Sequence, residues 1–219
     1  MNITGCIFDL DGVIVDTAKY HFIAWRRLAN ELGFDFSEEK NELLKGVSRQ
    51  QSLDLILEWG GVSLTDEEKQ RWMNDKNEWY LEYVRKMGPE EILEGVLPFL
   101  DHLEAEKIPF ALGSASRNAE LVLDLVGLSP RFTAVIDGNK TTKGKPDPEV
   151  FQKGASAMGV PPETTIVFED AQKGIEAARN GGFLAVGIGD ANVLQNAHVV
   201  LPDLSNQTVQ SLTQAMGLA

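Results

Sequence analysis

Short apolar runs that end in polar residues alternate along much of this chain with segments of helical periodicity. This pattern is typical of βα units, in which a helix follows each strand and returns the chain to a parallel sheet. We predict an α/β fold with a doubly wound, Rossmann-like parallel sheet. The six expected strands lie at residues 5–10, 109–113, 134–137, 165–168, 183–187 and 198–201.

Residues 17–87 break this alternation, because their apolar positions recur at helical spacing and no strand pattern is present. Two helices in this stretch have capping-box starts, at Ser48 and at Thr65, with Gln or Glu three positions later. We therefore expect an all-helical cap domain at 17–87, inserted after the first strand. The core domain would comprise residues 1–16 and 88–219, with hinges where the two domains join.

Composition limits the possible partners and compartments. A net charge of -13 argues against nucleic acid, although a local basic cluster can still hold a small anion. Cys6 is the only cysteine, so no intramolecular disulfide is possible, and its apolar neighbours predict a buried thiol. The chain has no basic leader and no uncharged apolar run of membrane-spanning length. We expect a soluble, cytoplasmic monomer that binds neither membrane nor nucleic acid.

The first predicted strand carries two acids, Asp9 and Asp11, at its polar end. On an extended backbone both side chains would point to the same side, where the two charges repel. A cation or a shared proton would relieve that repulsion, which favours a metal-assisted or acid/base site. The alternative is an ordinary polar turn at Asp11-Gly12.

Other polar residues follow later strands, at the sheet edge where open parallel sheets bind their ligands. Glu169 and Asp170 could hold Mg²⁺ together with the first two acids. Ser114, with N–H groups at the start of the next helix, could hold a phosphate, and Lys145 would neutralise the charge gathered there. Singly, these residues could be a helix cap, a solvated lysine and an acidic helix start.

These motifs resemble those of the haloacid dehalogenase superfamily of phosphotransferases, in order and over nearly the whole chain. The matching residues are Asp9-x-Asp11-Gly12-Val13-x-x-Asp16-Thr17, Ser114, Lys145-Pro146 and Glu169-Asp170. The insertion is similar to that of the glucose-phosphate mutases of this superfamily. That similarity rests on Thr17, His21, Trp25, Lys45-Gly46-Val47-Ser48-Arg49, Lys76-Asn77 and Ser114-Ala115-Ser116-Arg117-Asn118. Arg117 departs from the pattern, which usually has Lys there, so the geometry of phosphate binding at this position differs.

The resemblance implies that Asp9 is a nucleophile that accepts a phosphoryl group and that Asp11 is the general acid and base. Thr17, His21 and Lys76 would assist the catalytic carboxylates. Mg²⁺ would be held by Asp9, Glu169, Asp170 and the main-chain carbonyl of Asp11. The transferred phosphoryl group would be bound by Ser114, Ala115 and Lys145.

A mutase also needs a second phosphate site, which the resemblance places at Arg49, Ser116, Arg117 and Asn118. The sugar and the closing cap would involve Trp25, Lys45, Gly46, Val47 and Lys76. Without the resemblance, His21 is a polar residue on a helix face and Trp25 is cap core. The basic residues Lys45, Arg49 and Lys76 are then solvated surface charges.

The implied function is a Mg²⁺-dependent phosphomutase that interconverts β-D-glucose 1-phosphate and β-D-glucose 6-phosphate. The reaction would pass through an aspartyl-phosphate enzyme and β-glucose 1,6-bisphosphate. The alternative is a sugar-phosphate phosphatase of the same superfamily, in which water takes the phosphoryl group. A third possibility, a non-catalytic binding module, predicts loss of the nucleophile or of the metal acids, and all of these are present.

Overall fold

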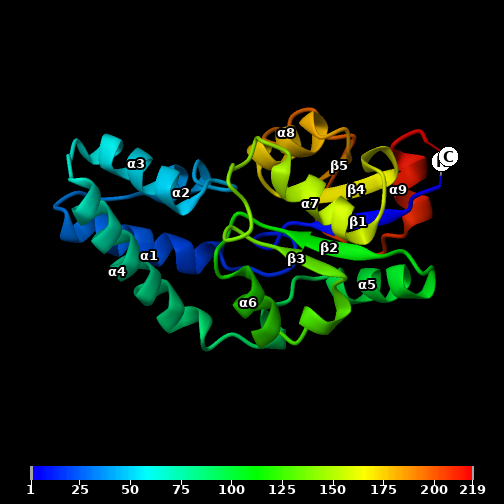
Figure 1. The fold of residues 1–219 in the computed structure, drawn as a ribbon, viewed down its shortest axis with the longest axis horizontal. Coiled ribbons are helices and arrows are strands. Elements are labelled where there is room, and N and C mark those ends of the chain that lie inside the picture. Colours follow the sequence, from blue (N-terminus) through cyan, green and yellow to red (C-terminus); the bar gives the residue numbers. More distant parts are fainter. Residues whose placement is uncertain (1, 219) are drawn as a thin grey trace.

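The structure is a computed structural model that describes residues 2–218. Its centre is a six-stranded parallel sheet with the order β3-β2-β1-β4-β5-β6 (Figure 1). Each predicted strand is present, with ends that differ by one or two residues. The strands are β1 (Gly5–Phe8), β2 (Phe110–Gly113), β3 (Ala134–Ile136), β4 (Thr165–Glu169), β5 (Leu184–Ile188) and β6 (Val199–Leu201).

Helices cover both faces of the sheet, which confirms the predicted doubly wound α/β fold. Side chains alternate between the faces, so that Ile7 of β1 packs in one apolar cluster while Cys6 and Phe8 pack in the other. The first cluster lies under α7 (Glu149–Met158) and α8 (Gln172–Asn180). The second lies under α5 (Val96–Ala105), α6 (Ala119–Leu125) and α9 (Val209–Ala215). Single 3-10 turns occur at Pro89–Glu91, Ser129–Arg131 and Pro162–Thr164.

The segment between β1 and α5 contains four helices, which project from one end of the sheet (Figure 1). The predicted capping box is complete at Thr65, where Thr65 and Glu68 bond reciprocally. At Ser48 only half of it forms, since Ser48 Oγ accepts the Gln51 N–H but Gln51 does not bond back to the Ser48 N–H. The helices enclose an apolar cluster of their own, built around Trp25 and neighbouring buried side chains. Their bounds are α1 (Ala18–Glu31), α2 (Glu38–Glu42), α3 (Arg49–Gly60) and α4 (Asp66–Val84). No helix within residues 2–218 combines the length and the apolar character needed to cross a membrane.

The first strand is shorter than predicted, and this changes the argument about its two acids. β1 ends at Phe8, and the chain then turns, with the N–H groups of Ile14 and Val15 both donating to the Leu10 carbonyl. The turn satisfies these groups locally, so alternation along an extended strand does not govern the acids. The prediction that strand geometry aligns them was therefore wrong, although both acids reach the same cavity.

Phe8 fastens this part of the chain to the core. Its ring is fully buried, stacks on Phe168 at 4.7 Å and meets three further rings edge-on, those of Phe99, Phe110 and Phe132. Aromatic pairs of this kind add to the free energy gained by burying apolar surface. The residue directly before Asp9 is thus held by both neighbouring strands and by α5.

We expect Phe8→Ala to lower the free energy of unfolding by about 3–5 kcal/mol, because the cavity left behind cannot collapse between fixed strands. Urea titration followed by circular dichroism measures the change. Val193→Ala is the matched control, since Val193 is 56% exposed. A loss below about 1 kcal/mol in Phe8→Ala would contradict this account of the core.

Candidate active site

A cavity lies where the helical insertion meets the carboxyl ends of the strands. Its enclosed volume is about 100 Å³, and the space out to its open mouth is about 830 Å³. Side chains from both parts of the chain line it. They are Asp9, Asp11, Ala18, His21, Trp25, Asn41, Leu44, Lys45, Gly46, Val47, Arg49, Ser52, Lys76, Asn77, Ser114, Ala115, Ser116, Arg117, Asn118 and Asp170.

One end of the cavity is acidic. Oxygen atoms of Asp9, Glu169 and Asp170 lie within 4.8 Å of one another, and Glu169 is fully buried. Lys145 Nζ lies 2.6 Å from Asp9 Oδ1 and also contacts Glu169 Oε1. Such an oxygen-rich group of carboxylates could hold a divalent cation.

Two glycines allow the backbone to approach these acids closely. Gly12 has φ +76°, and a β-carbon there would lie 2.3 Å from Asp170 Oδ2. A β-carbon on Gly174, in α8, would lie 1.9 Å from the Glu169 carboxyl carbon. Only glycine fits at either position, because any larger side chain would collide with a carboxylate of the cluster.

Burial and mutual repulsion control the protonation of the acids. Burial, with Asp9 and Asp170 adding to it, raises the pKa of Asp11 to about 8. Asp11 Oδ1 is buried and has no hydrogen-bond partner among residues 2–218. Asp11 is therefore protonated at neutral pH in the free protein, which is the form that can donate a proton.

Burial and neighbouring charges act in opposite directions on the pKa values of the other ionisable groups at the acidic end. Burial raises the pKa of Asp170 to about 6 against the opposing effect of Lys45, and raises that of Glu169 to about 8 against Lys145. Burial lowers the pKa of Lys145, but the neighbouring Asp9 and Glu169 outweigh it and raise the pKa above its ordinary value. Lys145 thus stays cationic among the acids.

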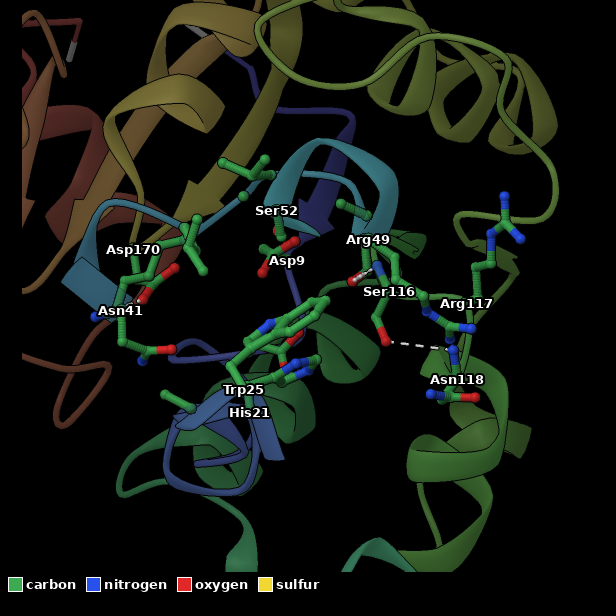
Figure 2. A pocket seen from close by; sticks show the side chains of 18 of the residues that line it. Asp9, His21, Trp25, Asn41, Arg49, Ser52, Ser116, Arg117, Asn118 and Asp170 are labelled. Atoms are coloured by element: carbon green, nitrogen blue, oxygen red, sulfur yellow. Dashed lines mark hydrogen bonds and ion pairs between the residues drawn. The ribbon is translucent and has the colours of Figure 1, made fainter. Parts of the chain in front are cut away.

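The other end of the cavity is basic (Figure 2). Arg49, the first residue of α3, and the exposed Arg117, in the loop after β2, both line this end of the cavity, and the Arg117 guanidinium is turned outward in Figure 2. Burial and the positive charge of Arg117 both lower the pKa of Arg49. Two cations at one end of the cavity could attract an anion.

Asn77 connects the two parts of the chain at this basic end. Its side-chain oxygen accepts a hydrogen bond from Arg49 Nη2 at 2.8 Å and another from Asn118 Nδ2 at 2.9 Å. One atom of α4 thus links a cation of the insertion to the core loop. The loop itself is folded by local bonds, in which Ser114 Oγ and Ser116 Oγ accept the N–H groups two residues later.

Lys76 and His21 lie between the two ends. Lys76 Nζ is 3.0 Å from His21 Nδ1 and sits over the Trp25 ring, 4.3 Å from its centroid. Burial, together with nearby cations, lowers the pKa of both Lys76 and His21 well below their ordinary values. The 2% exposed Lys76 contradicts the alternative of a solvated surface charge. Trp25 belongs to the apolar cluster of the insertion and also lines the cavity.

A second contact joins the insertion to the acidic end. Lys45 Nζ lies 3.2 Å from Asp170 Oδ2 and 2.9 Å from Glu42 Oε2. Beside it, Gly46 has φ +70° and packs near Ala171 of the core. The loop after α2 therefore covers one side of the acidic cluster.

Most predicted site residues line the cavity, but three lie behind its wall. Thr17, Lys145 and Glu169 are buried and are not part of the lining. Lys145 and Glu169 are joined to the lining through Asp9, which Lys145 contacts. The prediction for the Ser114 amides was wrong, because α6 begins only at Ala119 and these amides belong to a loop. Five lining residues were not predicted as site residues. Ala18, Asn41, Leu44 and Ser52 carry no motif signal, whereas Asn77 belongs to the Lys76-Asn77 pair of the resemblance but was given no role.

The family follows from the sequence as a whole. The sequence model of the haloacid dehalogenase-like hydrolases matches residues 3–182. The chain belongs to this family. Among curated members, it is 40% identical to the β-phosphoglucomutase of Bacillus subtilis (strain 168), over 94% of this chain and 92% of that protein. It is 29% identical to a phosphorylated carbohydrates phosphatase of Thermotoga maritima, over 80% of each chain.

The family fold is equally clear among solved structures. The crystal structure of a β-phosphoglucomutase from Clostridium difficile superimposes with a TM-score of 0.94 at 38% identity. That comparison covers 98% of this chain and 97% of the other. The sheet, the insertion and the cavity between them are therefore arranged as in a haloacid dehalogenase-like protein.

We expect Lys76→Met to raise the free energy of unfolding by about 1 kcal/mol or more, because it removes a buried cation while keeping the apolar contacts of the side chain. The pKa of Lys76 is lower in the folded protein, so folding releases a proton and native stability rises with pH. The difference in the free energy of unfolding between Lys76→Met and the native protein therefore becomes smaller as pH rises. Urea titrations at several pH values measure it, with the exposed Lys86→Met as control. A destabilised Lys76→Met would contradict the electrostatic argument.

Proposed function

We propose that this protein is a Mg²⁺-dependent phosphomutase that interconverts β-D-glucose 1-phosphate and β-D-glucose 6-phosphate. The observation that carries this proposal is the cavity with two unlike ends, one with a nucleophile and an acid and the other with paired arginines. A phosphatase needs only the first end. A mutase must bind a phosphate that does not react while the other end of the same sugar reacts.

At the acidic end, a carboxylate oxygen of unphosphorylated Asp9 would attack the reacting phosphorus of the sugar bisphosphate. The bond from phosphorus to the sugar oxygen breaks, and Asp11 gives its proton to that oxygen. In the reverse direction, Asp11 takes the proton of the attacking sugar hydroxyl. The raised pKa of Asp11 supports this role, because the acid holds its proton at neutral pH.

Lys145 and the loop after β2 would bind the phosphoryl group during transfer. Lys145 Nζ, 2.6 Å from Asp9, is close enough to neutralise charge that develops on the equatorial oxygens. Ser114 Oγ and the Ala115 N–H would contribute further donors from the loop. Most of the work of these residues is therefore positioning and neutralisation, as is general for phosphoryl transfer.

The acidic cluster fits Mg²⁺, a hard cation that prefers oxygen ligands. Asp9, Glu169 and Asp170 would hold it through carboxylates, and Asp11 through its main-chain carbonyl. When bound, the ion supplies positive charge that offsets repulsion between the phosphoryl group and the carboxylates. The close grouping of the three carboxylates and the raised pKa values of Glu169 and Asp170 support a site built for a cation.

At the basic end, Arg49, Arg117, Ser116 and Asn118 would bind the phosphate that does not react. Trp25, Val47 and Lys76 would contact the sugar between the two ends, while His21 and Thr17 support the catalytic acids from behind. The arginine at position 117 can bind phosphate through two parallel N–H groups of its planar guanidinium, whereas a lysine binds it as a point charge.

We further propose that residues 17–87 form a cap domain that closes over residues 1–16 and 88–219. The bonds from Asn77 to Asn118 and from Lys45 to Asp170 support a closed arrangement. Closure would exclude water from the phosphorylated Asp9, because hydrolysis there would end the mutase cycle. The proposed working form is a cytoplasmic monomer with a small sugar phosphate as its only substrate.

A sugar-phosphate phosphatase is the second candidate. The similarity to a phosphatase named for phosphorylated carbohydrates favours it, and the acidic end alone would suffice for its chemistry. In that reaction water, not a sugar hydroxyl, would take the phosphoryl group from Asp9.

³¹P NMR separates the two candidates, because every phosphorus species is followed at once. With Mg²⁺, β-glucose 1-phosphate and a trace of β-glucose 1,6-bisphosphate, we expect glucose 6-phosphate to form without stoichiometric inorganic phosphate. Release of one phosphate per sugar would identify the phosphatase.

Asp9→Asn should reduce turnover by at least about a thousandfold, because its amide cannot act as the nucleophile. Unchanged turnover in this variant would exclude the aspartyl-phosphate route.

We expect Mg²⁺ to bind at least about tenfold more tightly at pH 7 than at pH 5, with release of protons. The sign follows from Asp170, whose pKa of about 6 leaves the free carboxyl mostly protonated at pH 5 and ionised at pH 7. Isothermal titration calorimetry in two buffers of different ionisation enthalpy measures both quantities. Asp170→Asn should bind weakly and lose the part of the pH dependence that Asp170 contributes, whereas Glu169, whose pKa is about 8, should keep the rest. Equal affinity of the native protein at both pH values would contradict the proposed ligand set.

A further inference from the structure

Lys145 is placed in the acidic cluster by a loop that has no helix or strand of its own. The loop spans residues 137–148, between β3 and α7. Its lysine must reach past the sheet edge to lie 2.6 Å from Asp9 Oδ1 while remaining buried. A loop that carries such a charge needs fixed points, since an error of about 1 Å at a reacting centre costs rate.

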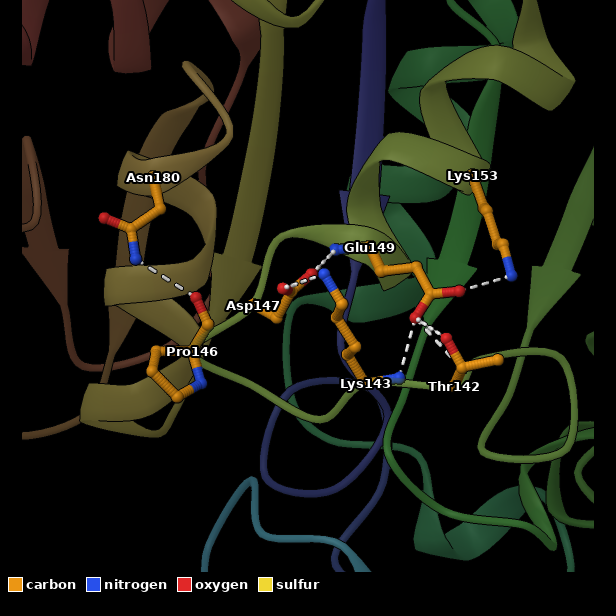
Figure 3. Close-up of polar contacts among 7 residues, drawn as sticks. All are labelled: Thr142, Lys143, Pro146, Asp147, Glu149, Lys153 and Asn180. Carbon is orange, nitrogen blue, oxygen red and sulfur yellow. Dashed lines mark hydrogen bonds and ion pairs between the residues drawn. The ribbon is translucent and has the colours of Figure 1, made fainter.

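The fixed point before Lys145 is Glu149, the first residue of α7 (Figure 3). Its Oε2 atom accepts three hydrogen bonds: from the Thr142 N–H at 2.9 Å, from Thr142 Oγ1 at 3.1 Å and from the Lys143 N–H at 2.7 Å. Its Oε1 atom accepts one from Lys153 Nζ at 2.6 Å, within the same helix. One carboxylate thus holds the two residues that lead into Gly144-Lys145.

The fixed point after Lys145 comes from a different helix. Asn180, at the end of α8, donates to the Pro146 carbonyl at 3.1 Å, and the Asp147 N–H donates back to Gly144. Lys145 therefore lies between two anchored stretches of backbone. Helix α7 is itself fixed to the sheet, because Val150 and Phe151 are buried beneath it.

The Glu149 carboxylate is ionised over the whole range in which the enzyme would work. The bond from Lys153, the Lys143 N–H and the donors of Thr142 lower the pKa of Glu149 to about 2. Hydrogen bonds to an ionised acceptor are stronger than those to a neutral one. Glu149 therefore stays negatively charged and holds the loop through several hydrogen bonds, although it lies outside the cavity lining.

We propose that Glu149 is a positioning residue for phosphoryl transfer, which acts by holding residues 142 and 143 so that Lys145 reaches Asp9. This inference rests on the proposed function, because it assigns Lys145 to the transferring phosphoryl group. Glu149 touches neither the substrate nor the reacting atoms. Its loss should therefore affect the transfer step and leave the distal phosphate site at Arg49 and Arg117 intact.

Steady-state kinetics with β-glucose 1-phosphate provide the first test. We expect Glu149→Ala to lower kcat at least about tenfold and to change KM by less than about threefold. Glu149→Gln retains an oxygen acceptor for the two N–H groups and should keep kcat within about threefold of the native value. Lys153 Nζ also donates to the Lys140 carbonyl of the same loop at 2.6 Å, so Lys153→Met would remove a second anchor. The matched control is therefore Glu67→Ala, which removes an exposed glutamate from the first turn of α4 and should behave like the native protein.

Glu149→Asp guards against a variant that fails to fold. It keeps the charge and the helix start but draws the carboxylate back by about 1.5 Å, so kcat should fall several-fold in a protein with a native circular dichroism spectrum. A native kcat in both folded Glu149→Ala and Glu149→Asp would overturn the inference. A raised KM with unchanged kcat would overturn it too, because that result would place the effect in substrate binding.

A second measurement does not depend on the sugar. Beryllium trifluoride with Mg²⁺ mimics a phosphoryl group on an aspartate, and ¹⁹F NMR reports its affinity. Glu149→Ala should bind this mimic at least about fivefold more weakly than the native protein, and Glu149→Gln should bind it normally. If the native protein fails to turn over glucose phosphate but shows this difference, the proposed function fails and the role of Glu149 stands. Equal affinity in native protein and Glu149→Ala would overturn that role.

Discussion

The contact of Lys145 with Asp9 and Glu169 is the interaction on which the rest of the site depends. Three carboxylates meet at the carboxyl edge of adjacent strands, because β1 and β4 are paired with Phe8 opposite Phe168. Acids at such short separation are costly to bury unless a cation compensates them. Lys145 supplies one buried positive charge from a loop, and a divalent cation would offset the negative charge that remains.

The insertion places basic side chains opposite this acidic edge of the sheet. Lys45 reaches Asp170, Lys76 lies in the middle of the cavity, and Arg49 stands at the far end beside Arg117. The cavity thereby has an acidic end and a basic end, and under the proposed function a sugar with phosphate at either position would lie along it in two directions. Burying these cations is unfavourable for stability, as the lowered pKa values of Lys76 and Arg49 show. Such strain is typical of functional sites, whose requirements compete with those of stability.

Sequence reasoning located the strands, the helical insertion and its caps, because each depends on residues close together in the chain. Ser48 and Thr65 cap helices as predicted, and the apolar runs became the sheet. It also gathered Asp9, Ser114 and Asp170 at one edge, since parallel strands place their carboxyl ends together. It erred at Asp11, where a turn replaced the expected extended chain, and at Ser114, whose helix begins later.

By itself, then, the sequence determined the fold class and the chemical character of the strand ends, since local periodicity and the geometry of parallel sheets suffice for both. Only the tertiary structure decided that Lys76 is buried, that Asn77 bridges Arg49 to Asn118, and that Glu149 holds the loop before Lys145. The physical reason is distance along the chain. Hydrogen bonds and burial of this kind depend on how the insertion lies against the core and how loops pack on helices, and no periodicity in the sequence records either arrangement.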